Sequence, residues 1–269
     1  MKDKSNKNFT LITIGLMLLT LLATQQIQAG DVLTGWSFDE SMPNNFKKHG
    51  YKIVKAADGH PVRDGKKSVR FELRHGDCGW SPGWSDCEND RQRHELTSKS
   101  DWGSVEHWYH WSIFIPESYP VIYPVKVALA QFHQRRAGPV LMFQNHDGGY
   151  FVNQQDGKYD NVSDIKILDD GEMRGKWTDV LAHIRWTHKK EGFIRIYVNG
   201  NTTPSYKRSG QTKLKGKRVY FKFGIYHTYV SRWDGDTPTQ VVYYDAVKKA
   251  RSCRKATDFF DCEKILQSN

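Results

Sequence analysis

Short runs rich in β-branched and aromatic residues recur along this chain, and turn-forming residues separate them. This pattern is typical of β-strands, whereas no long stretch shows the apolar period of a helix. We predict strands at residues 68–73, 91–97, 108–115, 127–133, 183–187, 193–198, 219–226 and 240–246, with a partly helical segment at 252–267. Asn199-Gly200, directly after one of these runs, predicts a hairpin turn. The predicted fold class is all-β, a sandwich of two antiparallel sheets.

The beginning of the chain has the features of a signal peptide. Three lysines precede an apolar run at 11–23, and Ala29 supplies a small residue at the cleavage point. An uncleaved membrane anchor is the alternative, but the run is shorter than the roughly 20 residues that a bilayer requires. We expect residues 1–29 to be removed, and residues 30–269 to form a single secreted or periplasmic β domain without membrane contact.

The excess of basic residues belongs to the predicted mature chain. Removal of the leader takes away three Lys and one Asp, so the formal charge falls only from +10 to +8. A basic surface attracts nucleic acid, anionic lipid or an acidic polysaccharide, and charge alone does not choose among them. Because we expect export, nucleic acid is not an expected partner.

Four cysteines form two pairs with the same spacing, Cys78 with Cys87 and Cys253 with Cys262. Four cysteines allow three connectivities, and local pairing in an oxidising compartment is the simplest of them. A zinc site would need tighter spacing of Cys and His residues. We therefore predict two short-range disulfides.

Alternation along three predicted strands separates an apolar face from a polar face, because successive side chains of a strand point in opposite directions. In 219–226 the apolar face is formed by Phe221, Phe223 and Ile225. The polar faces are formed by Tyr220, Lys222 and Tyr226 in 219–226, by Gln131 and His133 in 127–133, and by Arg93 and Glu95 in 91–97. If these strands are neighbours in one sheet, their polar faces form a floor suited to an anionic sugar.

The residues of these faces resemble the motifs of a known family. Arg93-His94-Glu95-Leu96, Gln131-Phe132-His133 and the segment 220–226 resemble, in this order, the three strand motifs of jelly-roll polysaccharide lyases. Segments 175–177, 183–186 and 198–200 extend the likeness to the heparin lyase I and glucuronan lyase group, and alginate lyases of the same fold share the three motifs. The resemblance implies a β-jelly-roll with a concave substrate cleft, and we expect a monomer.

The resemblance also implies β-elimination at a uronic acid, in which the C5 proton is removed and the glycosidic oxygen at C4 is expelled. Gln131 and Arg93 suit the substrate carboxylate, because an amide and a guanidinium donate hydrogen bonds to developing negative charge. His133 is the expected base, because an imidazole is largely neutral at pH 7. Tyr226 is the expected acid, because a phenol keeps its proton at that pH.

Further residues are candidates for substrate binding. These are Lys222, Glu95, His227 and Arg232, with Glu95 also a candidate for holding Arg93 in position. Each site residue has a purely structural alternative: a core histidine, a packed tyrosine, a surface ion pair or a solvated lysine.

The elimination requires no cofactor. Asp39 and Asp245 are candidates for a structural calcium site. Two carboxylates are far fewer than the roughly six to eight oxygen ligands that calcium takes.

Two other classes remain open at this level. A non-catalytic binding module for acidic polysaccharides would present the same basic and aromatic face. A glycoside hydrolase on a similar fold would need two carboxylates across the scissile bond, for which Glu88, Asp90 and Glu95 are candidates. The motifs leave the polymer open, whether mannuronate, guluronate, glucuronate or a sulfated glycosaminoglycan.

Overall fold

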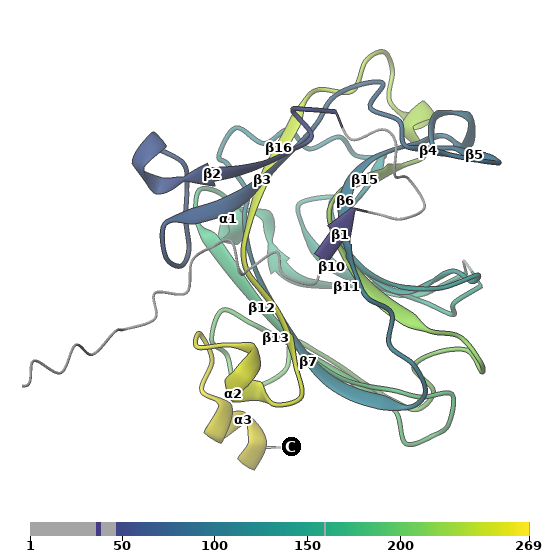
Figure 1. Cartoon of the computed structure of the whole chain (residues 1–269), viewed down its shortest axis with the longest axis vertical. Helices are drawn as coiled ribbons and strands as arrows, with labels where there is room; N and C mark the ends of the chain where they lie inside the picture. The colour runs from purple at the N-terminus through teal and green to yellow at the C-terminus, as the bar shows by residue number, and fades with distance from the viewer. Residues whose placement is uncertain (1–35, 39–46, 159, 269) are drawn as a thin grey trace, which may run out of the picture.

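The computed structural model describes residues 36–38, 47–158 and 160–268 of the chain (Figure 1). The predicted signal peptide and Asp39 lie outside the described residues. No helix in the described part of the chain is long and apolar enough to cross a membrane.

Two large antiparallel sheets face each other and form the two layers of the fold (Figure 1). The first sheet contains, in spatial order, β1 (Trp36–Phe38), β6 (Arg91–Ser98), β15 (Val219–Thr228), β8 (Lys126–Gln134), β9 (Pro139–His146), β10 (Gly149–Gln155) and β11 (Asn161–Asp169). The second contains β14 (Tyr206–Ser209), β13 (Phe193–Val198), β12 (Trp177–Trp186), β7 (Val105–Phe114), β16 (Gln240–Ala250), β3 (Lys67–Leu73) and β2 (Tyr51–Lys55). The predicted all-β class and the jelly-roll sandwich are confirmed.

Short elements connect and flank the sheets. A small hairpin is formed by β4 (Trp80–Ser81) and β5 (Trp84–Ser85). The helical elements are α1 (Asp170–Met173), α2 (Cys253–Ala256) and α3 (Cys262–Gln267), with 3-10 turns at η2 (Ala56–Asp58), η3 (Cys87–Asn89) and η4 (Val230–Arg232). The partly helical C-terminal segment is therefore confirmed.

Each of the eight predicted runs overlaps a strand, and the predicted hairpin joins β13 to β14, which pair as antiparallel neighbours. The prediction starts β12 too late, at residue 183, and misses the edge strands β1, β2 and β14, the hairpin of β4 and β5, and the three consecutive strands β9, β10 and β11. The last three are the longest of the missed strands. Their amide-rich ends interrupt the apolar alternation, as in the run Asn153, Gln154 and Gln155. Pairing within the sheet overrides this weak local signal, because tertiary neighbours supply the hydrogen bonds and packing of a strand.

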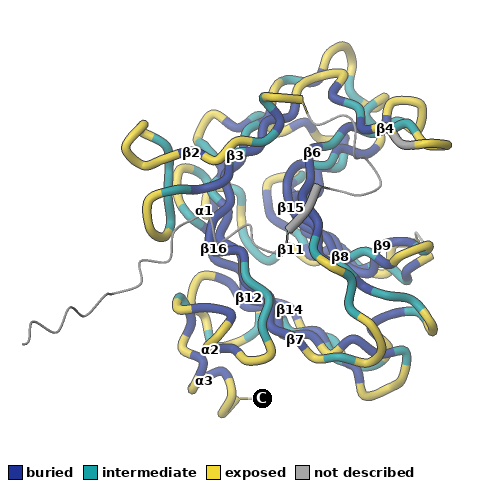
Figure 2. Tube along the Cα trace, in the orientation of Figure 1, coloured by how far each residue is buried: buried dark blue, intermediate teal, exposed yellow. Residues whose placement is uncertain are grey.

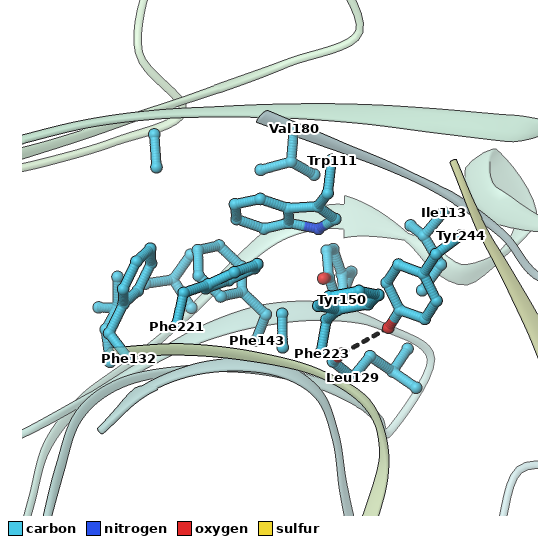
Figure 3. Packing of buried hydrophobic residues seen from close by; sticks show 14 of the residues in the cluster. Trp111, Ile113, Leu129, Phe132, Phe143, Tyr150, Val180, Phe221, Phe223 and Tyr244 are labelled. Atoms are coloured by element: carbon cyan, nitrogen blue, oxygen red, sulfur yellow. Dashed lines mark hydrogen bonds between the residues drawn. The ribbon is translucent and has the colours of Figure 1, made fainter. Parts of the chain in front are cut away.

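The core lies between the two sheets and is dominated by aromatic side chains (Figure 3). Phe221 and Phe143 from the first sheet pack against Trp111 from the second, with ring centroids 5.0 and 4.8 Å from the indole. Tyr244 places its ring in this core and donates its hydroxyl proton to the main-chain oxygen of Leu129. The apolar face predicted for 219–226 is thus the buried face of β15, and its polar face points away from the core.

The C-terminal helices cover the outer surface of the second sheet. Ile265 of α3 packs with Trp108, Leu181 and Tyr197 in a small apolar cluster separate from the main core. Both predicted disulfides are confirmed, and the bond between Cys253 and Cys262 links α2 to α3. Figure 2 shows the distribution of burial over the fold: the central strands of both sheets are buried, and many of the connecting loops are exposed.

Gly224 permits an irregularity in the pairing of β15 with β8. Its φ of +143° lies where side-chain-bearing residues are strained, and a Cβ there would collide with the main-chain oxygen of His94. The register between β15 and β8 shifts at this point, between Phe223 and Tyr226. The pairing with β6 on the other side continues without a shift, so Tyr226 stays on the same face as Lys222.

Candidate active site

Three adjacent strands bring the predicted polar faces together, because β15 lies between β6 and β8 in the first sheet. We call the combined surface the polar floor; it consists of Arg93, Glu95, Gln131, His133, Tyr220, Lys222 and Tyr226. Lys222 lies opposite Gln131, Tyr220 lies opposite His133, and Tyr226 lies opposite Arg93. Residues directly opposite each other project from the same side of a sheet, so these side chains share one face.

Glu95 connects three other members of the polar floor and is itself buried. One carboxylate oxygen accepts a hydrogen bond from Gln131 Nε2 at 2.6 Å. The other lies 2.6 Å from Lys222 Nζ and 3.6 Å from an Arg93 nitrogen. Because a buried charge is costly unless it is paired, the cations stabilise this carboxylate, and the carboxylate holds Lys222 and Gln131 in place.

Arg93 is held by a carboxylate that the sequence analysis did not identify. Its Nε and Nη2 donate to the two oxygens of Asp86 at 2.7 and 2.6 Å. Asp86 is fully buried and precedes Cys87, whose disulfide to Cys78 closes the loop that carries it. The sequence feature that could have identified Asp86 as a partner of Arg93 is its position, because it is an acidic residue next to a bridged cysteine and seven residues before Arg93.

Arg93 also contacts the ring of Tyr226, with its guanidinium carbon 4.2 Å from the ring centroid. Burial alone would lower the pKa of Arg93, but Tyr226 and the carboxylates of Asp86 and Glu95 raise it well above its ordinary value. The guanidinium is therefore charged at any physiological pH. It places a permanent positive charge beside the phenol of Tyr226.

His133 occupies the polar floor beside Tyr220 and is half-buried. Its Nδ1 lies 2.9 Å from the main-chain oxygen of Gln134 and 3.2 Å from the Tyr220 hydroxyl. Because a carbonyl oxygen only accepts hydrogen bonds, Nδ1 carries the proton of the neutral ring, and Nε2 keeps its lone pair. This tautomer leaves Nε2 able to accept a proton.

The prediction that His227 binds substrate is wrong. His227 follows Tyr226 on β15, so its side chain points to the opposite face, where it is buried and bonded to Gln240 at 2.7 Å. Arg232 lies outside the polar floor, in the exposed 3-10 turn after β15, with its guanidinium 4.2 Å from the ring centroid of Tyr229.

Burial of His227 leads to a prediction about acid stability. Burial lowers the pKa of His227 from 6.5 to about 4. Between these values the unfolded chain binds the proton and the folded chain does not, so the stability present above pH 6.5 is lost as the pH falls towards 4. We expect up to about 3 kcal/mol from this residue, and we expect His227→Gln to show a shallower loss of thermal stability between pH 7 and 4.5. The control is His188→Gln, which should lose thermal stability with falling pH as the wild type does. The prediction would be contradicted if thermal stability fell equally steeply with pH in the wild type and in His227→Gln.

Of the two candidate calcium ligands, Asp245 is the one that lies within the described residues. Asp245 is buried on β16, where its carboxylate accepts main-chain N–H bonds from Arg63, Asp64 and Ala246 at 2.9, 3.0 and 2.7 Å. These bonds satisfy the carboxylate without a cation. Asp39 lies outside the described residues.

One other group in the described residues has the composition of a metal site. Ligand atoms of His49, Asp77 and His94 lie within 4.8 Å of one another. His49 Nε2 is 2.8 Å from the Asp77 carboxylate, and His94 Nδ1 is 2.7 Å from the main-chain oxygen of Glu72. These contacts hold the segment before β2 and the loop after β3 against β6.

Polar side chains on the strands missed by the sequence analysis extend the polar floor. Met142 of β9 lies opposite Gln131, and Asn153 of β10 lies opposite Met142. Gln155 donates to the Met142 sulfur at 3.2 Å and to the Asn153 oxygen at 3.1 Å. The row that begins with Lys222 and Gln131 therefore continues across the sheet through Met142 and Asn153 to Asp164 of β11.

Comparisons with known proteins agree with this fold and site. A family model for polysaccharide lyases matches residues 35–248, so the chain belongs to the polysaccharide lyase family and is an enzyme of that class. This membership decides against the binding module and the glycoside hydrolase. No curated protein sequence matches the chain.

Solved structures of lyases share the fold at low sequence identity. An endo-β-1,4-glucuronan lyase from the fungus Trichoderma reesei is 14% identical, with 82% of this chain and 96% of that chain covered and a TM-score of 0.61. An alginate lyase of polysaccharide lyase family 7 is 18% identical, with 82% and 98% covered and a TM-score of 0.53. An alginate lyase from Pseudomonas aeruginosa is 13% identical, with 82% and 99% covered and a TM-score of 0.54.

Proposed function

We propose that this enzyme cleaves a uronic-acid-containing anionic polysaccharide by β-elimination and leaves 4,5-unsaturated uronide ends. The observation that carries the proposal is the network around Glu95, which holds Gln131, Lys222 and Arg93 beside Tyr226 on one face. The structurally similar glucuronan and alginate lyases support the substrate class.

The first requirement of the reaction is a more acidic C5 proton. The substrate carboxylate next to C5 gathers negative charge as the proton leaves, so donors that meet this carboxylate lower the barrier. Arg93 contributes a permanent charge, and Gln131 has a second amide N–H that its bond to Glu95 does not use. We assign the neutralisation of the carboxylate to these two residues.

The second requirement is a base and an acid on the same face. We assign the base to His133, whose Nε2 is free of the proton, and the acid to Tyr226, whose hydroxyl passes its proton to the C4 oxygen as the bond breaks. Lys222 lies 5.9 Å from the ring centroid of Tyr226, so its charge stabilises the phenolate that forms. The epimer at C5 decides whether Tyr226 also removes the proton.

The charge beyond the polar floor also suits a polyanion. Arg91, Lys126 and Arg232 surround the ring of Tyr229 just past the Tyr226 end of β15, at 4.9, 6.0 and 4.2 Å from its centroid. We include Arg232 among the groups that attract the polymer to this end. Residues 1–29 act as a cleaved leader in this proposal, and the two disulfides support export to an oxidising compartment.

A panel of pure acidic polysaccharides tests the proposal. We expect at least one of alginate, glucuronan and a heparin-like polymer to give an ultraviolet-absorbing unsaturated product, with a neutral polysaccharide as the control. New reducing ends without absorbance, or tight binding without any cleavage, would each contradict elimination.

A further inference from the structure

A basic pocket lies beyond the Tyr220 end of the polar floor. Its volume is about 610 Å³, and its lining residues are Arg135, Arg136, Gly216, Lys217, Arg218 and Tyr220. The four cations and Gly216 come from two loops, the one between β8 and β9 and the one that leads into β15, and Tyr220 lies on β15 itself. Neither the motifs nor the proposed chemistry uses these four cations.

The lining carries positive charge and no carboxylate. Within the described residues, Arg136, Lys217 and Arg218 form no ion pair with an acidic side chain. Lys217 Nζ donates to the main-chain oxygen of Arg136 at 2.8 Å, and the Arg218 guanidinium stacks 2.9 Å from the ring centroid of the exposed Trp102. These contacts hold the Lys217 ammonium and the Arg218 guanidinium in place without neutralising their charge.

The backbone also holds this arrangement. Arg136 has a φ of 55°, a left-handed conformation that residues with a side chain rarely adopt. The loop therefore keeps a cationic residue at a position where glycine would be less strained. Arg135 N donates to the Arg218 main-chain oxygen at 2.9 Å, which joins the two loops.

The pocket is continuous with the polar floor, because Tyr220 belongs to both. The Tyr220 hydroxyl lies 3.2 Å from His133 Nδ1, and the Arg135 guanidinium carbon lies 5.9 Å from the Tyr220 ring centroid. A polymer chain that lies along β15 and passes His133 therefore reaches the pocket next.

We propose that this pocket is a remote anion subsite that binds the carboxylate or sulfate group of a substrate sugar beyond the scissile linkage. The inference rests on the proposed function and adds a determinant of polymer binding to it. Arginine and lysine recognise both anions through charge-assisted hydrogen bonds. The subsite favours long, densely charged polymers over short oligosaccharides, because only a long chain fills the polar floor and the pocket together.

The double variant Arg136→Gln/Lys217→Gln tests the subsite. We expect KM for the polymer to rise about tenfold, as two partly exposed ion pairs are lost, while kcat stays within about twofold. Oligosaccharides too short to reach the pocket should keep their wild-type KM. The matched control is Lys52→Gln/Lys55→Gln, which removes the same charge from exposed positions on β2, the edge strand of the other sheet.

Equilibrium binding of the polymer, measured separately from cleavage, distinguishes the subsite from the proposed function. Absence of unsaturated product from the wild type would count against elimination, whereas equal polymer affinities of wild type and double variant would overturn the subsite. The subsite would also be overturned if the Lys52→Gln/Lys55→Gln control lost as much polymer affinity as the double variant. An equal loss of affinity of the double variant for short oligosaccharides would overturn it too. Parallel titrations with an unsulfated polyuronate and a sulfated glycosaminoglycan identify the anion, since the loss is larger for the polymer whose group the pocket binds.

Discussion

Tyr226→Phe is expected to reduce formation of the unsaturated product by roughly 10²–10⁴-fold, the usual contribution of a positioned general acid. The variant loses only the hydroxyl that donates the proton to the departing C4 oxygen. The phenylalanine ring keeps the contact with Arg93, whose guanidinium carbon lies 4.2 Å from the ring centroid. The fold should therefore survive, and the rate of absorbance increase measures the chemical step.

Tyr243→Phe is the matched control, because this hydroxyl lies on the second sheet, 3.3 Å from His60. It should leave turnover unchanged. His133→Ala should resemble Tyr226→Phe, since Nε2 of His133 is the proposed proton acceptor. Normal turnover in Tyr226→Phe would refute the acid role, and normal turnover in His133→Ala would transfer the base role to Tyr226.

Glu95→Gln is the second change with a large expected effect, on both stability and activity. The variant removes the negative charge that lies 2.6 Å from the buried ammonium of Lys222. The positive charges of Lys222 and Arg93 then lie near each other without the carboxylate that compensates both. Removing one partner of a buried ion pair costs about 3–5 kcal/mol. Urea denaturation should show this loss, and product formation should fall because Gln131 and Lys222 are no longer held.

A second variant separates the two effects of Glu95→Gln. In Glu95→Gln/Lys222→Met the unpaired ammonium is absent, so we expect stability to recover while activity stays low. Glu106→Gln, which removes an exposed carboxylate 2.8 Å from His183, is the control and should change little. Full activity in a folded Glu95→Gln enzyme would show that the network does not position the site.

Local patterns were sufficient to predict the strands that contain the motifs. Alternation assigned Phe221 and Phe223 to the core and Lys222 and Tyr226 to the opposite face, and the described structure agrees. The same rule should have excluded His227, which has the parity of the core residues. Its place next to a motif was weaker evidence than the alternation of the strand.

The partners of these residues depended on contacts between distant parts of the chain. Alternation placed Gln131 of β8 and Lys222 of β15 on polar faces, but their pairing with Glu95 and the pairing of Asp86 with Arg93 exist only once the strands and the loop are assembled. The basic pocket arises in the same way from two loops.

The sequence by itself determined the all-β class, the short-range disulfides, the face on which each motif residue lies and the family. These properties depend on the period of two along a strand, on closely spaced cysteines and on the order of the motifs. Only the tertiary structure decided which strands are neighbours, which carboxylate holds each cation and where a pocket opens. Ion pairing and burial depend on distances between groups far apart in the chain, and these distances exist only once the sheets have formed.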